Sequence, residues 1–137
     1  QVNATYYSAL GESDEKMLLA RAIQMFMPGK PQVWYLDLFA GKNDHEAVRR
    51  AGESGHKEIN RTNLSTDQIA EDLKKDVVQK QLALIRMRNT HKAFSEGAEV
   101  AVSGGESSLQ IRWEYNSAFA TLNVNFESGT YTIVESR

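Results

Sequence analysis

The side chains best suited to metal binding or acid–base chemistry lie in one polar, glycine-punctuated stretch of the chain. His45, Glu46, His56 and Glu58 supply imidazole and carboxylate groups there. Such groups bind zinc in many proteins, but their spacing here matches no standard pattern of metal ligands. We therefore predict no metal site at these four side chains and no cofactor.

A pair of aromatic residues near the C-terminus is the second candidate for binding. Trp113 and Tyr115 alternate with Arg112 and Glu114, so they would share one face of a strand. Such a face can stack against a sugar ring, but aromatic residues spaced two apart more often belong to a sheet core. We predict a core position for Trp113 and keep a carbohydrate-binding or interaction module as an alternative function.

Composition excludes several classes of protein. The 137 residues are 41% apolar, which suits one ordinary domain core. Sixteen basic and eighteen acidic residues give a net charge of -2, which argues against a nucleic-acid partner. The absence of cysteine excludes disulfide scaffolds and makes a cytoplasmic location the simplest interpretation. No apolar run reaches the roughly 18 residues of a membrane span, so we predict no membrane partner.

The N-terminal half predicts a helix followed by a buried strand. Ser13 is a suitable N-cap, and apolar residues at helical spacing follow it to about Met27. The stretch 33–39 is apolar except for one aspartate, which is typical of a strand buried on both faces in a parallel sheet. Trp34 and Tyr35 would be packing residues of that strand.

The predicted strand has no partner of its own kind in this sequence. One strand cannot form a sheet, so its neighbours would have to come from a larger protein. An apolar strand with unpaired backbone favours association with other chains. We therefore expect the isolated chain to self-associate.

The middle of the chain predicts a long polar segment and further helices. Residues 42–63 are polar, with a short helix over 44–50, and a segment of this length usually has a function. Ser65 opens a capping-box pattern for a helix to about residue 73, and Asp76 begins a longer one over 76–92. The basic residues of that longer helix are expected on a solvated face: Arg86, Arg88 and Lys92.

After Gly97 the apolar spacing changes from helical to alternating. Residues 109–115, 118–126 and 131–133 alternate between apolar and polar side chains. The pairs at 104–105, 116–117 and 128–129 contain the glycine, asparagine and serine residues that favour hairpin turns. This pattern predicts a four-stranded antiparallel sheet with one solvated face.

The order of elements and several short stretches resemble the sucrose phosphorylase family of glycoside hydrolase family 13. These stretches are QVNATYYSALG at 1–11, LARAIQ at 19–24, PGKPQVWY at 28–35, AGKND at 40–44, EINR at 58–61 and RMRN at 86–89. The resemblance implies an α+β chain. Residues 1–94 would be the last helix–strand–helix part of a (β/α)8 barrel, and 95–137 a small antiparallel β domain. The wording WYLDLF at 34–39 and GHKEINR at 55–61 looks closer to the glucosylglycerate phosphorylase branch.

The resemblance also implies a retaining, two-step transfer of a glucosyl group from sucrose or glucosylglycerate to phosphate. Retaining chemistry needs two carboxyl groups about 5–5.5 Å apart on a rigid frame. In this family the nucleophile, the acid/base and a third aspartate would all lie upstream of Gln1. The chain would then hold no catalytic residue and be inactive alone, with a sugar and inorganic phosphate as partners of the whole enzyme. A fragment of a related hydrolase is the other alternative.

The resemblance points to three supporting residues in this chain. Gln1 corresponds to a glutamine on the acceptor side of the site, where an amide can both donate and accept hydrogen bonds. Lys57 falls where sucrose phosphorylases carry an arginine of the glucose pocket, and it offers a point charge instead of a planar fork. Glu58 takes the place of the family's aspartate. These three residues are the predicted substrate-binding groups.

Overall fold

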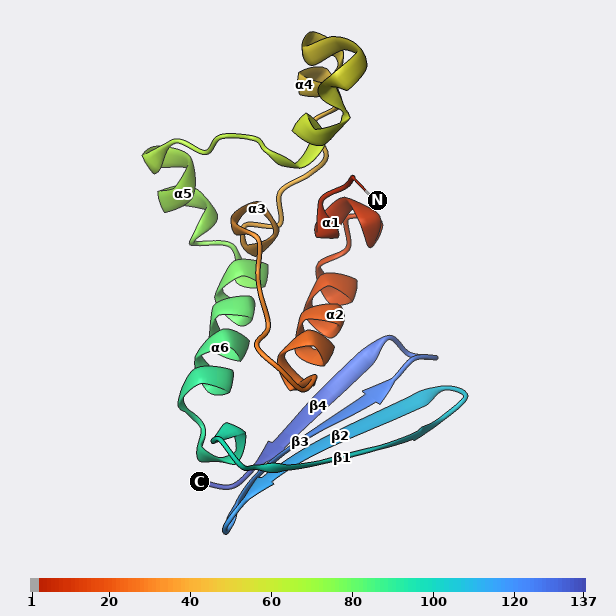
Figure 1. Cartoon of the computed structure of the whole chain (residues 1–137), viewed down its shortest axis with the longest axis vertical. Coiled ribbons are helices and arrows are strands. Elements are labelled where there is room, and N and C mark those ends of the chain that lie inside the picture. The colour runs from red at the N-terminus through yellow and green to blue at the C-terminus, as the bar shows by residue number, and fades with distance from the viewer. Residues whose placement is uncertain (1–2) are drawn as a thin grey trace. The chain divides into compact units, whose positions relative to one another are not determined.

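The computed structural model describes residues 3–137 and shows helices followed by a four-stranded antiparallel sheet, as the predicted α+β class requires (Figure 1). The helical elements are α1 (Tyr6–Ala9), α2 (Asp14–Phe26), α3 (Tyr35–Leu38), α4 (His45–Ala51), the 3-10 helix η1 (Gly52–Asn60), α5 (Thr66–Asp72), α6 (Asp76–Thr90) and the 3-10 helix η2 (Lys92–Phe94). The strands are β1 (Glu99–Gly105), β2 (Ser108–Tyr115), β3 (Ala118–Asn125) and β4 (Thr130–Glu135). No helix formed by residues 3–137 is both long and apolar enough to cross a bilayer.

The described residues form two compact units. Unit 1 comprises residues 3–17 and 32–81, and unit 2 comprises 18–31 and 82–137. Unit 1 therefore holds α1, α3, α4, η1 and α5, whereas unit 2 holds the sheet. A domain boundary between residues 94 and 95 stays a prediction.

Helix α2 begins and ends close to the predicted positions. The Ser13 hydroxyl accepts the Lys16 N–H at 3.3 Å, and two carboxylates follow in the first turn, where the helix dipole favours negative charge. The helix ends at Phe26, and Gly29 then adopts a φ of 99° that glycine tolerates. The buried side chains recur at helical spacing: Met17, Leu18, Ala22, Met25 and Phe26. The helix predicted over 13–27 is confirmed.

The predicted strand over 33–39 is wrong. Its centre forms the single helical turn α3. After this turn Ala40 adopts a φ of 51°, and the Gly41 N–H donates to the Leu36 carbonyl at 2.9 Å. This is a Schellman arrangement, which satisfies carbonyls at a helix end. A strand needs a neighbouring backbone for its N–H and C=O groups, and among residues 3–137 the only strands are β1–β4. Local helical bonds therefore take the place of a sheet ladder.

The side chains of this stretch are also less buried than predicted. Leu36 is buried, but Trp34 and Tyr35 are 49% and 38% exposed. Each of the two aromatic residues directs its polar atom to a backbone carbonyl: the Trp34 indole donates to Asn60 at 3.0 Å and the Tyr35 hydroxyl donates to Thr62 at 2.8 Å. Through these hydrogen bonds the two residues connect segments of unit 1, and they are not core residues.

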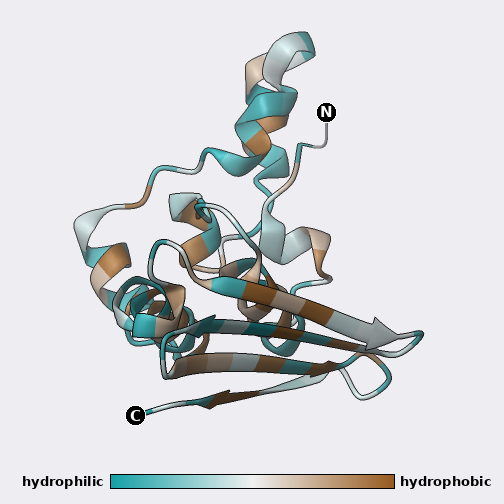
Figure 2. Ribbon diagram, turned by 60° about the horizontal axis from the view of Figure 1, so that its bottom comes forward, coloured by the Kyte–Doolittle hydropathy of each residue, from teal (hydrophilic) through white to brown (hydrophobic). Residues whose placement is uncertain are grey.

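The sheet of unit 2 has the predicted hairpin order and the predicted alternation of its faces, as the hydropathy colours show (Figure 2). On one face Ile111 pairs with Leu122, which pairs with Ile133, and the first two are fully buried. The other face carries polar pairs, such as the Gln110 amide donating to Asn123 at 2.7 Å. The prediction of a four-stranded antiparallel sheet is confirmed.

An aromatic cluster joins α2, η2 and the sheet inside unit 2. The Phe94 ring lies 5.3 Å from the Phe26 ring and 5.5 Å from Trp113, between ring centroids. The Trp113 indole N–H donates to the Phe26 carbonyl at 2.6 Å. Because aromatic pairs and a satisfied indole both stabilise a buried contact, this cluster fixes η2 against β2.

The predicted solvated position of Arg88 is wrong. Its guanidinium carbon lies 4.3 Å from the Trp113 ring centroid and 4.8 Å from that of Phe94. A guanidinium N–H donates to the Gly29 carbonyl at 2.8 Å. Burial lowers the pKa of this guanidinium. The faces of the aromatic rings attract the cation, which explains why Arg88 is packed inside unit 2. Helix spacing alone does not show this interaction. Arg86 and Lys92 are exposed, as predicted.

Candidate functional site

Two of the predicted site residues lie in η1, over Gly52–Asn60. Lys57 is exposed, whereas Glu58 is half-buried and its carboxylate lies 3.4 Å from the Arg61 guanidinium. η1 is a 3-10 helix, whose hydrogen-bond geometry is poorer than that of an α-helix. Gln1, the third predicted residue, lies outside the described residues.

Asp44 connects the two ends of the segment that carries Lys57 and Glu58. Its carboxylate accepts the Ala47 N–H at 2.8 Å and begins α4, while its own N–H donates to the Ile59 carbonyl at 2.8 Å. The Thr62 hydroxyl reaches the same carboxylate at 3.4 Å. The Ala47 hydrogen bond is the main reason that the pKa of Asp44 lies below its usual range. Residues 44–62 are thereby closed into one loop.

Asn60 connects this loop to the first described residues of the chain through hydrogen bonds. Its side-chain amide donates to the Ala4 carbonyl at 3.3 Å, and its own carbonyl accepts the Trp34 indole N–H at 3.0 Å. The next N–H, that of Thr5, donates to the Asn43 side chain at 2.7 Å. Sequence reasoning missed the roles of Asn60 and Asn43, because an asparagine that bonds distant backbone has no spacing signature.

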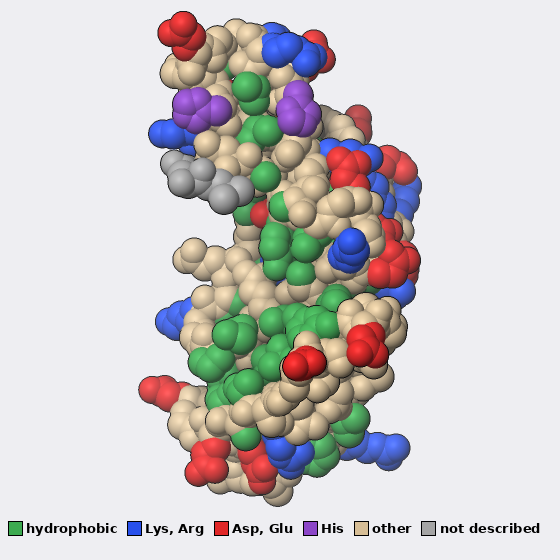
Figure 3. All heavy atoms as spheres, turned by 90° about the vertical axis from the view of Figure 1, so that its right-hand side faces the viewer, with side chains coloured by type: hydrophobic (Ala, Val, Ile, Leu, Met, Phe, Trp, Pro, Cys, Tyr) green, Lys and Arg blue, Asp and Glu red, His purple; other side chains and the backbone are tan. Residues whose placement is uncertain are grey.

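The histidines of this region do not form a metal site. His45 and His56 are exposed, and histidine side chains stand apart on the surface of the α4–η1 region (Figure 3). Among residues 3–137 no group of three or more His, Cys, Asp or Glu side chains is arranged to hold a metal ion. Zinc sites in proteins use at least three such ligands.

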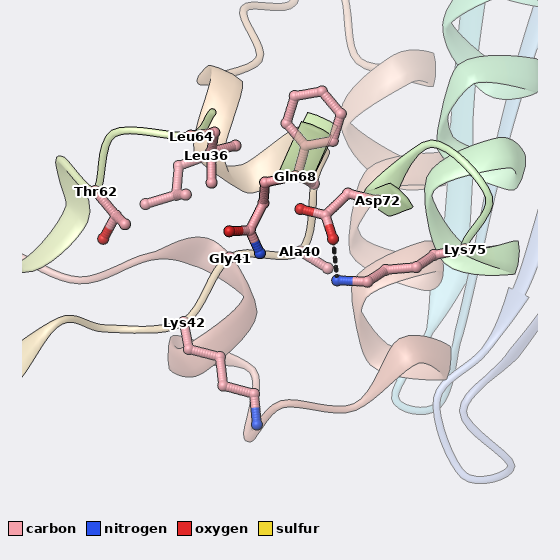
Figure 4. Close-up of a pocket in the computed structure, with 10 residues that line it drawn as sticks. Leu36, Ala40, Gly41, Lys42, Thr62, Leu64, Gln68, Asp72 and Lys75 are labelled. Carbon is pink, nitrogen blue, oxygen red and sulfur yellow. Dashed lines mark ion pairs between the residues drawn. The ribbon is translucent and has the colours of Figure 1, made fainter. Parts of the chain in front are cut away.

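A pocket of about 280 Å³ lies in unit 1 and shares Thr62 with this loop (Figure 4). Apolar side chains of Leu36, Phe39 and Leu64 line part of it. Lysines also line it, but each is paired with a carboxylate. Lys75 lies 2.8 Å from Asp72, and Lys42 lies 2.6 Å from Glu12. The paired charges leave little attraction for an anion, and the pocket contains none of the predicted site residues.

Trp113 does not form a sugar platform. It is only 7% exposed and its indole N–H is satisfied inside unit 2, as described above. A sugar-stacking aromatic must present a free ring face, and this ring packs against Phe94. The prediction that Trp113 is a core residue is confirmed.

The carboxyl groups with clear pKa shifts are held in their ionised form. The pKa of Glu12 is lowered chiefly by Lys42, that of Glu15 by a backbone N–H, and that of Asp44 by the Ala47 N–H. The acid of a retaining glycosidase needs the opposite shift, because it must carry a proton at neutral pH. These three carboxylates therefore suit capping and ion pairing better than proton donation.

Comparison with known proteins shows relatives that match nearly the whole chain. It is 54% identical to the sucrose 6(F)-phosphate phosphorylase of Ilumatobacter coccineus over 97% of its length. It is 44% identical to the sucrose phosphorylase of Agrobacterium vitis over 99%. The chain spans only 25% and 27% of the length of these two relatives. No family model matches it.

A solved structure shares the fold. The crystal structure of sucrose 6F-phosphate phosphorylase from Thermoanaerobacter thermosaccharolyticum matches with a TM-score of 0.92 and 40% identity. The match covers all of this chain and 27% of the crystallised one, in its C-terminal part. The structural similarity to this phosphorylase therefore includes the sheet. The short stretches of similar sequence, in contrast, were found only before residue 94.

The predicted glucosylglycerate phosphorylase branch is wrong. The glucosylglycerate phosphorylase of Escherichia coli is 27% identical over 69% of the chain, well below the sucrose phosphorylases. The prediction rested on two short stretches, at 34–39 and 55–61, and the identity over the whole chain outweighs them.

Proposed function

We propose that this chain, which belongs to the sucrose phosphorylase family, forms the C-terminal part of a retaining glucoside phosphorylase. The whole enzyme would transfer a glucosyl group from sucrose or a phosphorylated sucrose to inorganic phosphate. The observation that supports this most strongly is 54% identity over 97% of the chain to a relative with that named activity, of which the chain spans 25%. A cytoplasmic location is part of the same proposal.

The reacting carboxyl groups would lie in the part of the enzyme that precedes this chain. Retaining transfer needs a nucleophile that attacks the anomeric carbon and an acid that protonates the leaving oxygen, about 5–5.5 Å apart. The shifted carboxyls described above are all stabilised as anions, which supports a non-catalytic role for them. Phosphate would then attack the glucosyl-enzyme from the side that the leaving group vacates.

This chain would contribute to substrate recognition through Gln1, Lys57 and Glu58. Lys57 is exposed, so its ammonium can donate hydrogen bonds to sugar hydroxyls without breaking a structural contact. Glu58 can accept hydrogen bonds from hydroxyls, although part of its charge is shared with Arg61. A sugar binds mainly through such directed hydrogen bonds, and recognition by these groups would need η1 held in a fixed place.

A chimera tests the proposal directly. In it, this chain replaces the matching C-terminal segment of the Ilumatobacter coccineus enzyme. We expect it to release glucose 1-phosphate from sucrose or sucrose 6(F)-phosphate when phosphate is present. Release of free glucose at the same rate with and without phosphate would instead favour a hydrolase. A folded chimera with neither activity would contradict the proposal.

A further inference from the structure

Side-chain hydrogen bonds to backbone hold the loop of η1 against the beginning of unit 1. The Asn60 amide donates to the Ala4 carbonyl at 3.3 Å, across 56 residues of sequence. The Trp34 indole donates to the Asn60 carbonyl at 3.0 Å, across 26 residues. One residue therefore joins three segments that are far apart in the chain.

Further hydrogen bonds hold the N-terminal segment in unit 1. The Thr5 N–H donates to the Asn43 side chain at 2.7 Å, and the Tyr6 N–H donates to the Asp37 carboxylate at 2.7 Å. The Asn43 N–H donates in turn to the Ser8 hydroxyl at 3.0 Å. The N-terminal segment thus has its own polar contacts with residues 37 and 43, and Asn60 adds its contact with η1.

We propose that Asn60 is a positioning residue, which holds the Lys57–Glu58 segment and the N-terminal segment at residues 4–6 in one fixed arrangement. Lys57 and Glu58 precede Asn60 by three and two residues, and Gln1 precedes Ala4 by three. Groups that the proposed function assigns to sugar recognition are therefore each within three residues of the same hydrogen bond. The inference rests on that proposed function for its role in recognition.

The chemistry of an asparagine suits this position. Its amide nitrogen donates to a carbonyl, which a carboxylate of the same shape cannot do. Asn60→Asp would set two acceptors against each other at the Ala4 carbonyl. It therefore removes the bond with the least change in volume. Trp34→Phe removes the other bond at Asn60 and keeps an aromatic ring.

The first test measures hydrogen exchange in the 137-residue chain. We expect Asn60→Asp to speed exchange of the Thr5 and Tyr6 amides about tenfold or more, because the N-terminal segment loses a tether. Trp34→Phe should have a smaller effect of the same kind. The amides of β2 and β3 should not change, which shows that the chain still folds. Asn63→Ala, an exposed asparagine in the following loop, is the matched control and should leave exchange as it is.

The second test uses the chimera described above. Asn60→Asp should raise the KM for the donor sugar about tenfold and change kcat less than threefold, because binding groups are displaced while the reacting carboxyls are untouched. A purely structural role would lower the active fraction and leave KM unchanged. Unchanged amide exchange in Asn60→Asp, or a fall in kcat alone, would overturn the proposal. If the chimera without substitutions is inactive, the proposed function and the role of Asn60 in sugar recognition are both overturned. The hydrogen-exchange measurement then tests only whether Asn60 holds the N-terminal segment in place.

Discussion

The carboxylate of Asp44 accepts the Ala47 N–H at 2.8 Å and so begins α4, the helix that leads into η1. That hydrogen bond lowers the pKa of Asp44 in the folded chain. The stability that the ionised group contributes is therefore present above its unfolded pKa and is lost as the pH falls through the folded pKa. Asparagine can cap a helix as well, but it does not titrate.

We therefore expect wild type to lose its stability advantage over Asp44→Asn on acidification. The measurement is the difference in free energy of unfolding between the two proteins across the acid range. Asp67→Asn, an exposed aspartate in the first turn of α5, serves as the control. A difference for Asp44→Asn that stays constant with pH would contradict the role of this carboxylate.

Lys57 is exposed in η1, and we propose that it binds the donor sugar. In the active chimera, Lys57→Ala should raise the donor KM roughly tenfold, because a charge-assisted hydrogen bond is lost. Lys57→Arg should keep most of the affinity, since it retains the charge and adds a fork of donors. Steady-state kinetics with varied donor measure both. Equal KM values for Lys57→Ala and wild type would show that Lys57 is a solvated surface lysine.

Single residues were predictable where the pattern is local. Ser13 and Ser65 act as N-caps at the expected positions, because a cap and its helix are adjacent in sequence. Arg88 and Asn60 were not predictable, since the Trp113 ring and the Gly29 and Ala4 carbonyls that they contact lie 25 to 59 residues away. Helix spacing carries no information about such distant aromatic rings and carbonyls.

At the scale of elements, the turn after α3 depends on a glycine without a side chain. A Cβ atom at Gly41 would lie 2.4 Å from Leu36 Cδ1 and 3.0 Å from the Leu36 carbonyl. Leu36 is 1% exposed, so it has little room to move. Gly41→Ala should therefore destabilise the chain by about 1–3 kcal/mol, as overpacking typically does.

A urea titration followed by circular dichroism measures this change. The control is Gly105→Ala at the end of β1, where the nearest atom to a Cβ is Ser108 Oγ at an ordinary 3.6 Å. We expect that variant to stay close to wild type. An equal effect of both substitutions would show that the contact with Leu36 is not the cause.

The elements differ in how well their sequences predict them. The prediction of the sheet is correct because each hairpin pairs strands that are adjacent in sequence. Alternating apolar residues and turn residues therefore suffice to predict it. The stretch 33–39 is different, since an apolar run predicts burial but not the partner that a strand requires. Within residues 3–137 its backbone forms the α3 turn, and Trp34 and Tyr35 face outward.

At the scale of the molecule, the exposed aromatic residues of unit 1 bear on association. Trp34 and Tyr35 are 49% and 38% exposed, and in the proposed enzyme additional polypeptide would be available to cover them. Exposed apolar groups favour contact between copies. We expect the chain, of 15.4 kDa, to form dimers or larger species as its concentration rises in multi-angle light scattering. A constant mass of one chain over a hundredfold range of concentration would contradict this.

We propose that the reacting carboxyls of the enzyme lie outside these 137 residues. The most direct test mixes this chain with the separately produced upstream three quarters of the Ilumatobacter coccineus enzyme and measures glucose 1-phosphate formed from sucrose or sucrose 6(F)-phosphate and phosphate. We predict that each piece alone is inactive and that the mixture is active. Glucose 1-phosphate produced by the pure chain alone, at a rate proportional to its concentration, would contradict this proposal.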